Sequence, residues 1–326
     1  IYNIDTNVYA TYKYYNMIYP IVNYDENDTI QNIKKLLYDS VNKRTITDRP
    51  IGCLLSGGLD SSIIASIMNK SVSNLKTFSI GLKGSPDLHH AQNVAKFLNT
   101  NHTNVLVTEK QMLDMIENTI YQIESYDITT IRASVPMFLL SQYIRDNTDI
   151  KVVLSGEGSD EASGSYLYFH NAPDSQSFQN ECIRLLQDVQ YFDVLRGDKT
   201  TAGAGLEIRV PFFDKTFMEY YMSISPEKKM VRDNMEKYLL RKAFINDLPD
   251  DVVWRRKDGF SDGVSSFEKP WYQIVEEYAQ KNYNMNESEM YKHIYNKYYN
   301  GVENIPYMWM PKWSDSKDPS NRSINI

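Results

Sequence analysis

Cysteine is nearly absent from this chain, which carries only Cys53 and Cys182 among its 326 residues. Two cysteines so far apart exclude a disulfide framework and a cysteine-based zinc site, and they are typical of a reducing compartment. The sequence also lacks an apolar run of about 18 residues and a basic segment followed by an apolar one. It therefore predicts no membrane span and no signal peptide, and a cytoplasmic location.

Positive charge is not in excess. The 35 Lys and Arg residues are outnumbered by 42 Asp and Glu residues, which gives a net charge of -7 at pH 7. A nucleic-acid binder needs a clustered cationic face, and no long Lys/Arg run is present, so nucleic acid is not an expected partner. Glycine and proline are scarce, at 14 and 12 residues, and 42% of the residues are hydrophobic. The chain is therefore neither collagen-like nor disordered, and it is long enough for about two globular domains.

Strands and helices alternate along the first half of the chain. Helical spacing of apolar residues predicts a helix over 29–43, and short apolar runs predict strands at 51–55, 75–82, 103–107 and 151–154. Between the strands, helical periodicity predicts helices at 59–70, 87–98, 110–123 and 135–145. This alternation implies right-handed crossovers and an α/β fold with a doubly wound parallel sheet, buried on both faces. Ligands of such sheets bind at the carboxyl ends of the strands.

The pattern divides the chain into three regions. Residues 1–28 are aromatic and turn-rich and predict a hairpin or entry linker that packs against another surface, with Tyr9, Tyr12, Tyr14 and Tyr15 as packing residues. Residues 29–172 are the expected sheet domain. Residues 173–326 are expected to be mostly helical and to complete a cleft, with helices near 175–195, 215–222, 235–245 and 271–280.

A run of small residues between the first strand and its helix carries the strongest functional signal. It comprises Ser56, Gly57, Gly58, Leu59, Asp60, Ser61 and Ser62. Backbone amides in such a loop can close around an anion at the positive end of the helix, and the serine hydroxyls can add donors. The run lacks the lysine of the Gly-x-x-x-x-Gly-Lys-Ser/Thr loop and the Gly-x-Gly-x-x-Gly spacing. The alternative interpretation of this run is a purely structural one, a tight turn followed by a capped helix.

This run resembles the pyrophosphate loop of ATP pyrophosphatases, which split ATP between the α and β phosphates. Seven further segments resemble motifs of the glutamine-dependent asparagine synthetases, in order and across essentially the whole chain. They are 85–88, 126–133, 154–161 followed by 166–170, 206–211, 237–241, 257–263 and 308–313. The resemblance implies a sheet domain of the adenine-nucleotide α-hydrolase kind.

The reaction implied by the resemblance uses ATP and magnesium (Mg²⁺). The side-chain carboxylate of aspartate is adenylated with release of pyrophosphate, and ammonia then attacks to give asparagine and AMP. By resemblance, Asp60 and Asp160 hold Mg²⁺ on the pyrophosphate, and carboxylates are the hard oxygen ligands that this ion prefers. The alternative for either aspartate alone is a helix-capping residue.

Nucleotide contacts are also implied by the resemblance. The main chain at Leu54 and Ile80, where the first two strands end, is expected to grip adenine, whereas the two side chains are ordinary core residues. Ser155 and Gly156 match positions that contact the nucleotide.

Two residues match catalytic positions of the family. Glu157 is expected to help form the aspartyl-adenylate and could accept a proton from the attacking nitrogen. Lys237 matches the lysine beside the transferring phosphate, where a cation stabilises charge that grows on pyrophosphate. The alternative for Lys237 is an exposed helix lysine.

Four further residues match the cleft wall of the helical half. They are Asp193, Arg196, Glu207 and Arg209, which are candidates for substrate contact. The alternative is that they form internal ion pairs.

The family's glutaminase centre has no counterpart here. Complete enzymes of this type carry an amino-terminal glutaminase domain whose first residue is a cysteine nucleophile, whereas Cys53 falls in a buried strand and Cys182 in a helix. The chain is expected to use free ammonia or to receive it from a fused or separate glutaminase domain, for which residues 1–28 are the expected junction. A homodimer is possible.

Two other functions remain open from the sequence. The β-lactam-forming branch shares the first loop, but it has tyrosine where Glu157 stands. The second alternative is a non-catalytic nucleotide-binding homologue. Against it stand the intact residues Glu157, Asp60, Asp160 and Lys237.

Overall fold

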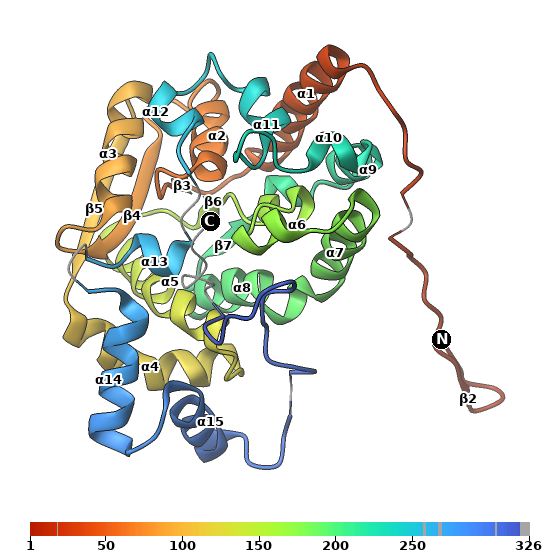
Figure 1. Cartoon of the computed structure of the whole chain (residues 1–326). Helices are drawn as coiled ribbons and strands as arrows, with labels where there is room; N and C mark the ends of the chain where they lie inside the picture. The colour runs from red at the N-terminus through yellow and green to blue at the C-terminus, as the bar shows by residue number, and fades with distance from the viewer. Residues whose placement is uncertain (18, 257–258, 267–268, 304, 320–326) are drawn as a thin grey trace.

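A parallel sheet forms the centre of the computed structural model (Figure 1), which describes residues 1–17, 19–256, 259–266, 269–303 and 305–319. Strands and helices alternate after the first long helix, α1 (Glu26–Arg44). In chain order they are β3 (Ile51–Leu54), α2 (Leu59–Met68), β4 (Lys76–Leu82), α3 (Pro86–Leu98), β5 (Asn101–Val107), α4 (Glu109–Ile123), α5 (Ile128–Asn147) and β6 (Val152–Leu154). The predicted alternation is confirmed.

The sheet reverses its winding direction between two neighbouring strands. Its order is β5-β4-β3-β6-β7, and every neighbouring pair is parallel. The chain runs outward from β3 to β5 and then returns through α4 and α5 to place β6 on the other side of β3. The loops that follow β3 and β6 therefore lie at the point where such sheets open a crevice for ligands.

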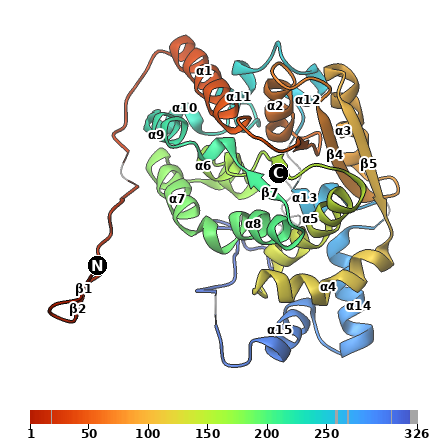
Figure 2. The same cartoon turned by 180° about the vertical axis from the view of Figure 1, so that it is seen from behind.

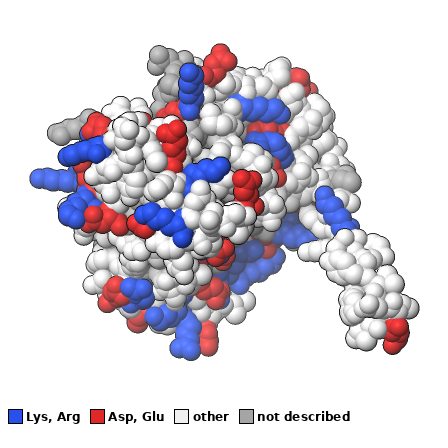
Figure 3. All heavy atoms as spheres, turned by 90° about the horizontal axis from the view of Figure 1, so that it is seen from below, with Lys and Arg blue, Asp and Glu red and all other residues white. Residues whose placement is uncertain are grey.

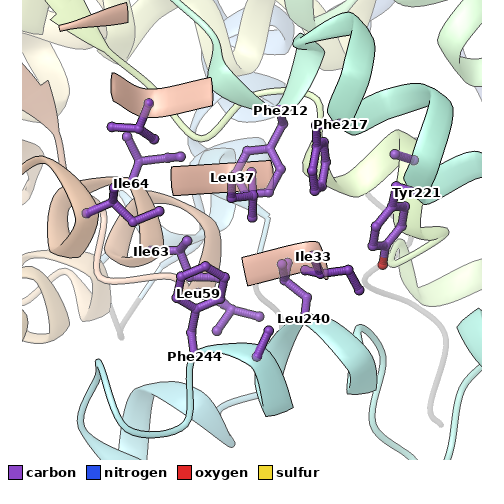
Figure 4. Packing of buried hydrophobic residues seen from close by; sticks show 14 of the residues in the cluster. Ile33, Leu37, Leu59, Ile63, Ile64, Phe212, Phe217, Tyr221, Leu240 and Phe244 are labelled. Atoms are coloured by element: carbon purple, nitrogen blue, oxygen red, sulfur yellow. The ribbon is translucent and has the colours of Figure 1, made fainter. Parts of the chain in front are cut away.

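Helices cover both faces of the sheet, as Figures 1 and 2 show for α1–α3 on one face and α4 and α5 on the other. On the first face, Leu37 of α1 and Ile63 of α2 belong to one buried apolar cluster, which Figure 4 shows from close by. On the second face, Phe78 of β4 and Ile120 of α4 belong to another cluster. The sheet is therefore buried on both sides, which confirms the doubly wound α/β prediction.

The second half is mostly helical, as predicted, but it also extends the sheet. It supplies β7 (Glu207–Arg209), the strand beside β6. Two short helical segments, α6 (Ser159–Ser163) and η1 (Leu167–Asn171), precede this half. Its own helical segments are α7 (Ser175–Asp188), η2 (Val189–Tyr191), α8 (Asp193–Gly203), η3 (Pro211–Phe213), α9 (Lys215–Ser223), α10 (Pro226–Lys229), α11 (Tyr238–Ala243), α12 (Asp250–Val253), α13 (Phe260–Gly263), α14 (Trp271–Tyr283) and α15 (Glu287–Tyr298). The division at residue 172 stays a prediction.

Two of the expected helices differ from the structure. The helix predicted over 175–195 is interrupted at Phe192, whose φ of -127° and ψ of -104° are not helical. The helix predicted over 235–245 begins only at Tyr238, because Lys237 has a φ of 60°. Both interruptions lie at residues of the cavity described below, so they turn side chains toward it.

The amino-terminal segment does not pack as predicted. It forms the expected hairpin, β1 (Tyr2–Asn3) with β2 (Val8–Tyr9), but this hairpin extends away from the body of the protein (Figures 1 and 3). Tyr9, Tyr12 and Tyr14 are exposed. The segment reaches the body before Val22: Met17 and Tyr19 pack against the first apolar cluster, and the Val22 amide donates to the carbonyl of Ser223 at 2.8 Å.

Charges of both signs are interspersed over the face that Figure 3 presents, without a large field of one sign. Within the described parts of the chain, no helix is both long and apolar enough to cross a membrane.

Candidate active site

A cavity of about 250 Å³ opens at the carboxyl ends of β3, β4 and β6. Most of the residues selected from the sequence line it. They are Leu54, Ser56, Gly58, Asp60, Ser61, Ile80, Ser155, Gly156, Glu157, Asp160, Asp193, Arg196 and Lys237. Residues from both halves of the chain thus meet in one place.

The loop between β3 and α2 leaves the helix N-terminus open to the cavity. Gly57 has a φ of 78°, and a Cβ there would lie 2.4 Å from the backbone of His90 and Ala91, so this position requires glycine. No side chain caps the amino end of α2. Its free amides and the helix dipole suit a bound anion such as phosphate.

The loop after β6 lies directly against the first loop. A Cβ on Gly156 would lie 2.8 Å from the amide nitrogen of Ser61, so only glycine permits this approach. Ser159 at the start of α6 donates a hydrogen bond of 2.7 Å to Asp60 Oδ1. The two loops are therefore held together at the mouth of the predicted phosphate site.

Lys237 connects these loops from the helical half. Its Nζ lies 2.6 Å from Asp60 Oδ2 and also pairs with Asp160 Oδ1. Only 3% of its side chain is exposed, so the alternative of an exposed helix lysine does not hold. The left-handed backbone at Lys237 ends the preceding loop and begins α11.

The two aspartates around Lys237 are suited to hold a divalent cation. Their oxygens already face one common cation, and hard oxygen donors are what Mg²⁺ prefers. The described residues contain no group of three or more His, Cys, Asp or Glu side chains arranged to hold a metal. Phosphate oxygens and water would therefore have to complete the coordination, as is usual for Mg²⁺.

A second charged group lies in the same cavity around Arg196. The guanidinium pairs with Glu157 and also with Asp193 at 2.6 Å. Burial raises the pKa of Glu157 to about 7; the Arg196 guanidinium opposes this effect, and the nearby Asp193 and Asp160 add to it. Burial also acts on Asp193, but the Arg196 guanidinium, the neighbouring Glu161 carboxyl group and the Tyr166 hydroxyl hold its pKa below the usual value. Glu157 is therefore poised to exchange a proton near neutral pH.

Glu161 and Tyr166 were not selected as site residues from the sequence, although both fall in the motif at 154–161 and 166–170. The Tyr166 hydroxyl lies 2.6 Å from Glu161 Oε1 and 2.8 Å from Asp193 Oδ2. Burial, together with Asp193 and Asp160, raises the pKa of Glu161 well above its usual value. A motif match cannot indicate which of its side chains point into a cavity, so these two were missed.

Four of the selected residues do not line the cavity. Gly57 packs against α3, and the Ser62 hydroxyl is buried without a hydrogen-bond partner. Glu207 and Arg209 form an ion pair of 2.6 Å on β7, and Arg209 Nη1 donates to two carbonyl oxygens at the end of α1. Glu207 and Arg209, like Asp193 and Arg196, are thus paired with each other, but the Glu207 side chain is 60% exposed. In the motif at 257–263, Lys257 and Asp258 lie outside the described residues.

A family model described as asparagine synthase matches residues 32–183 and 171–310. The chain belongs to the asparagine synthase family. The resemblance stated from the sequence motifs is thereby confirmed, and most of the residues that line the cavity lie within the matched region.

Curated relatives of this chain include glutamine-hydrolyzing asparagine synthetases. The one from Cricetulus griseus is 42% identical over 326 residues, which is 92% of this chain and 58% of the relative. The one from Homo sapiens is 40% identical over 347 residues, 98% of this chain and 61% of the relative. The chain thus spans about three fifths of the curated relatives it matches.

Among solved structures, NMN synthetase from Francisella tularensis matches with a TM-score of 0.36 and 13% identity, covering 84% of this chain and 94% of that chain. Similarity at this level supports no conclusion about function.

Proposed function

We propose that this chain performs ATP-dependent asparagine synthesis. The side-chain carboxylate of aspartate attacks the α-phosphorus of ATP, the bond to pyrophosphate breaks, and β-aspartyl-AMP forms. Ammonia then attacks the acyl carbon, the bond to AMP breaks, and asparagine is released. The observation that carries the proposal is a single cavity in which Lys237, Asp60 and Asp160 lie beside the amino end of α2, with Glu157 and Arg196 in the same cavity.

The nucleotide would lie along the loops after β3 and β6. We expect the main chain at Leu54 and Ile80 to hold adenine, and the amides from Ser56 to Ser61 to hold phosphate oxygens. Asp60 and Asp160 would hold Mg²⁺, which supplies positive charge to the leaving pyrophosphate. Lys237, which contacts both aspartates, would supply further positive charge as the bond to pyrophosphate breaks.

Glu157 is the candidate for the proton transfer that amide formation requires. Attack by ammonia leaves a positively charged nitrogen, and a carboxylate in the cavity can accept one of its protons. Arg196 pairs with Glu157 and would keep the carboxylate in place.

The nitrogen source is proposed to be ammonia, either free or delivered by a glutaminase domain. Cys53 and Cys182 are both buried and unpaired, and burial raises the pKa of each thiol, to about 12 for Cys182. Neither thiol is therefore suited to act as the nucleophile of a glutaminase. A cytoplasmic location and a homodimer also stay predictions.

The products of ATP cleavage test the proposed reaction. We expect AMP, pyrophosphate and asparagine in equal amounts when aspartate, ammonia and Mg²⁺ are all present, and little ATP cleavage without aspartate. Product analysis by chromatography measures this balance. ADP and inorganic phosphate as products would contradict the proposal.

The rate should depend on pH through Glu157. With a pKa of about 7, Glu157 is protonated below neutral pH and cannot accept a proton, so we expect the rate to fall about tenfold per pH unit below about 6.5 and to level off above about 7.5. The measurement is asparagine formation at constant free ammonia, with total ammonium adjusted at each pH. A flat profile across this range would argue against Glu157 as the proton acceptor.

A further inference from the structure

Carboxylates outnumber cations around Arg196. Glu157 and Asp193 both pair with Arg196, whereas Glu161 has no ion pair among the described residues. Another cation of the cavity lining, Lys237, is engaged by Asp60 and Asp160. Carboxylate groups at this part of the cavity are therefore short of positive charge, in agreement with the raised pKa of Glu161, and a cation bound there would favour the ionised form of Glu161.

Hydrogen-bond donors are also lacking there. Tyr166 carries a single hydroxyl proton, yet its oxygen lies within hydrogen-bond distance of both Glu161 Oε1 and Asp193 Oδ2. The second carboxylate oxygen, Glu161 Oε2, is buried and has no hydrogen-bond partner. Glu161 lines the cavity, and only 4% of the residue is exposed. A buried carboxylate oxygen without a donor is costly, so its retention at a cavity indicates a ligand that supplies one.

The same cavity holds an unpartnered donor. Arg196 Nε is buried without a hydrogen-bond partner. An unpartnered acceptor on Glu161 and an unpartnered donor on Arg196 match the two charged groups of an α-amino acid, which carries an ammonium and a carboxylate on one carbon.

We propose that Glu161, together with Asp193, binds a primary ammonium group in this cavity. The Tyr166 hydroxyl lies within hydrogen-bond distance of both carboxylates, so the two are close enough to bind the same ammonium group, which has three N–H donors. One source of this group is the α-ammonium of the amino-acid acceptor, and that case rests on the proposed function. The second source is the free ammonium ion. Glu161 then selects an acceptor that carries an amino group over a plain dicarboxylate.

The variant Glu161→Gln tests this binding, because it keeps the size of the side chain but cannot take up the negative charge that pairs with an ammonium group. Loss of a buried, charge-assisted contact should weaken aspartate binding by about 10- to 100-fold. Calorimetry with aspartate measures the change, and succinate, which has both carboxylates but no ammonium, should bind the variant and the wild type equally. If the ammonium ion is the ligand, the KM for ammonium rises by a similar factor, and aspartate binding stays unchanged.

Glu181→Gln is a matched control. Glu181 is also a buried glutamate that accepts from a tyrosine hydroxyl, that of Tyr168 at 2.8 Å, but it pairs with Arg184 and lies outside the cavity lining. This control should lower the melting temperature without changing the affinity for aspartate. If Glu161→Gln does not fold, Glu161→Asp is the second variant, because it moves the carboxylate back by one methylene. Its affinity for aspartate should still fall, and its affinity for succinate should stay unchanged.

Because binding is measured independently of turnover, failure of the proposed function can be distinguished from failure of the proposed role of Glu161. A wild-type protein that binds aspartate but releases no pyrophosphate counts against the proposed function alone. A folded Glu161→Gln protein with unchanged aspartate affinity and unchanged KM for ammonium overturns the role of Glu161.

Discussion

Replacing Glu157 with glutamine is expected to slow asparagine formation by about a hundredfold or more, which corresponds to about 3 kcal/mol of transition-state stabilisation. Glutamine keeps the shape of the side chain and can still accept a hydrogen bond from Arg196, but it cannot take a proton from the attacking nitrogen. ATP binding should change much less, because the expected phosphate contacts come from the two loops and Lys237 rather than from Glu157. Steady-state kinetics and ATP titration of one protein preparation measure both effects.

Glu157 could instead serve only to pair with Arg196. In that case Glu157→Gln would lower the melting temperature and leave turnover per folded molecule nearly intact. The pH profile gives an independent measurement, because the fall in rate below neutral pH should disappear in the variant if Glu157 is the proton acceptor. Normal turnover together with an unchanged pH profile would remove Glu157 from the mechanism.

Replacing Lys237 with methionine is expected to reduce both activity and stability. The rate should fall by about a hundredfold or more, because no cation would remain at this position to stabilise the leaving pyrophosphate. The free energy of unfolding should fall by about 3–5 kcal/mol without added metal, since Asp60 and Asp160 would be left without their shared partner. Mg²⁺ should raise the melting temperature of Lys237→Met more than that of the wild type, because the variant's two carboxylates lack a competing ammonium.

A second buried lysine provides the control for this experiment. Lys229 is 3% exposed like Lys237, but its Nζ donates to the neutral Gln179 at 2.8 Å, and burial lowers its pKa to about 8. Lys229→Met leaves no carboxylate unpaired, so it should cost much less stability and show no added response to Mg²⁺. Equal Mg²⁺ responses of Lys237→Met, Lys229→Met and the wild type would argue against metal binding by Asp60 and Asp160.

Local sequence was sufficient for the elements of the sheet. The strand predicted at 75–82 is observed as Lys76–Leu82, and the helix predicted at 110–123 is observed as Glu109–Ile123. Apolar periodicity specifies such elements because each must bury one face against its neighbours. The small residues from Ser56 to Ser62 likewise placed the strand-to-helix loop, and with it the end of the sheet at which the cavity lies.

Local sequence patterns did not predict the short or interrupted elements. The three residues of β7 become a strand only because they pair with β6. The break at Phe192 separates two helical segments that share one apolar pattern, and it depends on contacts that a local window does not contain. Periodicity over a few residues carries too little information to specify either feature.

The direction of the side chains at the site was decided by the tertiary structure. Ser61 and Ser62 are equivalent hydroxyls in the sequence, but the step of about 100° between neighbouring residues of α2 directs Ser61 to the cavity and buries Ser62. Lys237 lies 177 residues from Asp60 in sequence, and Arg196 lies 39 residues from Glu157. The sequence by itself thus determined the sheet, the loop and the kinds of residue that the chemistry needs. Only the packing of the helical half against the sheet decided which charges meet, because ion pairs between distant residues depend on how whole elements are oriented and not on local spacing.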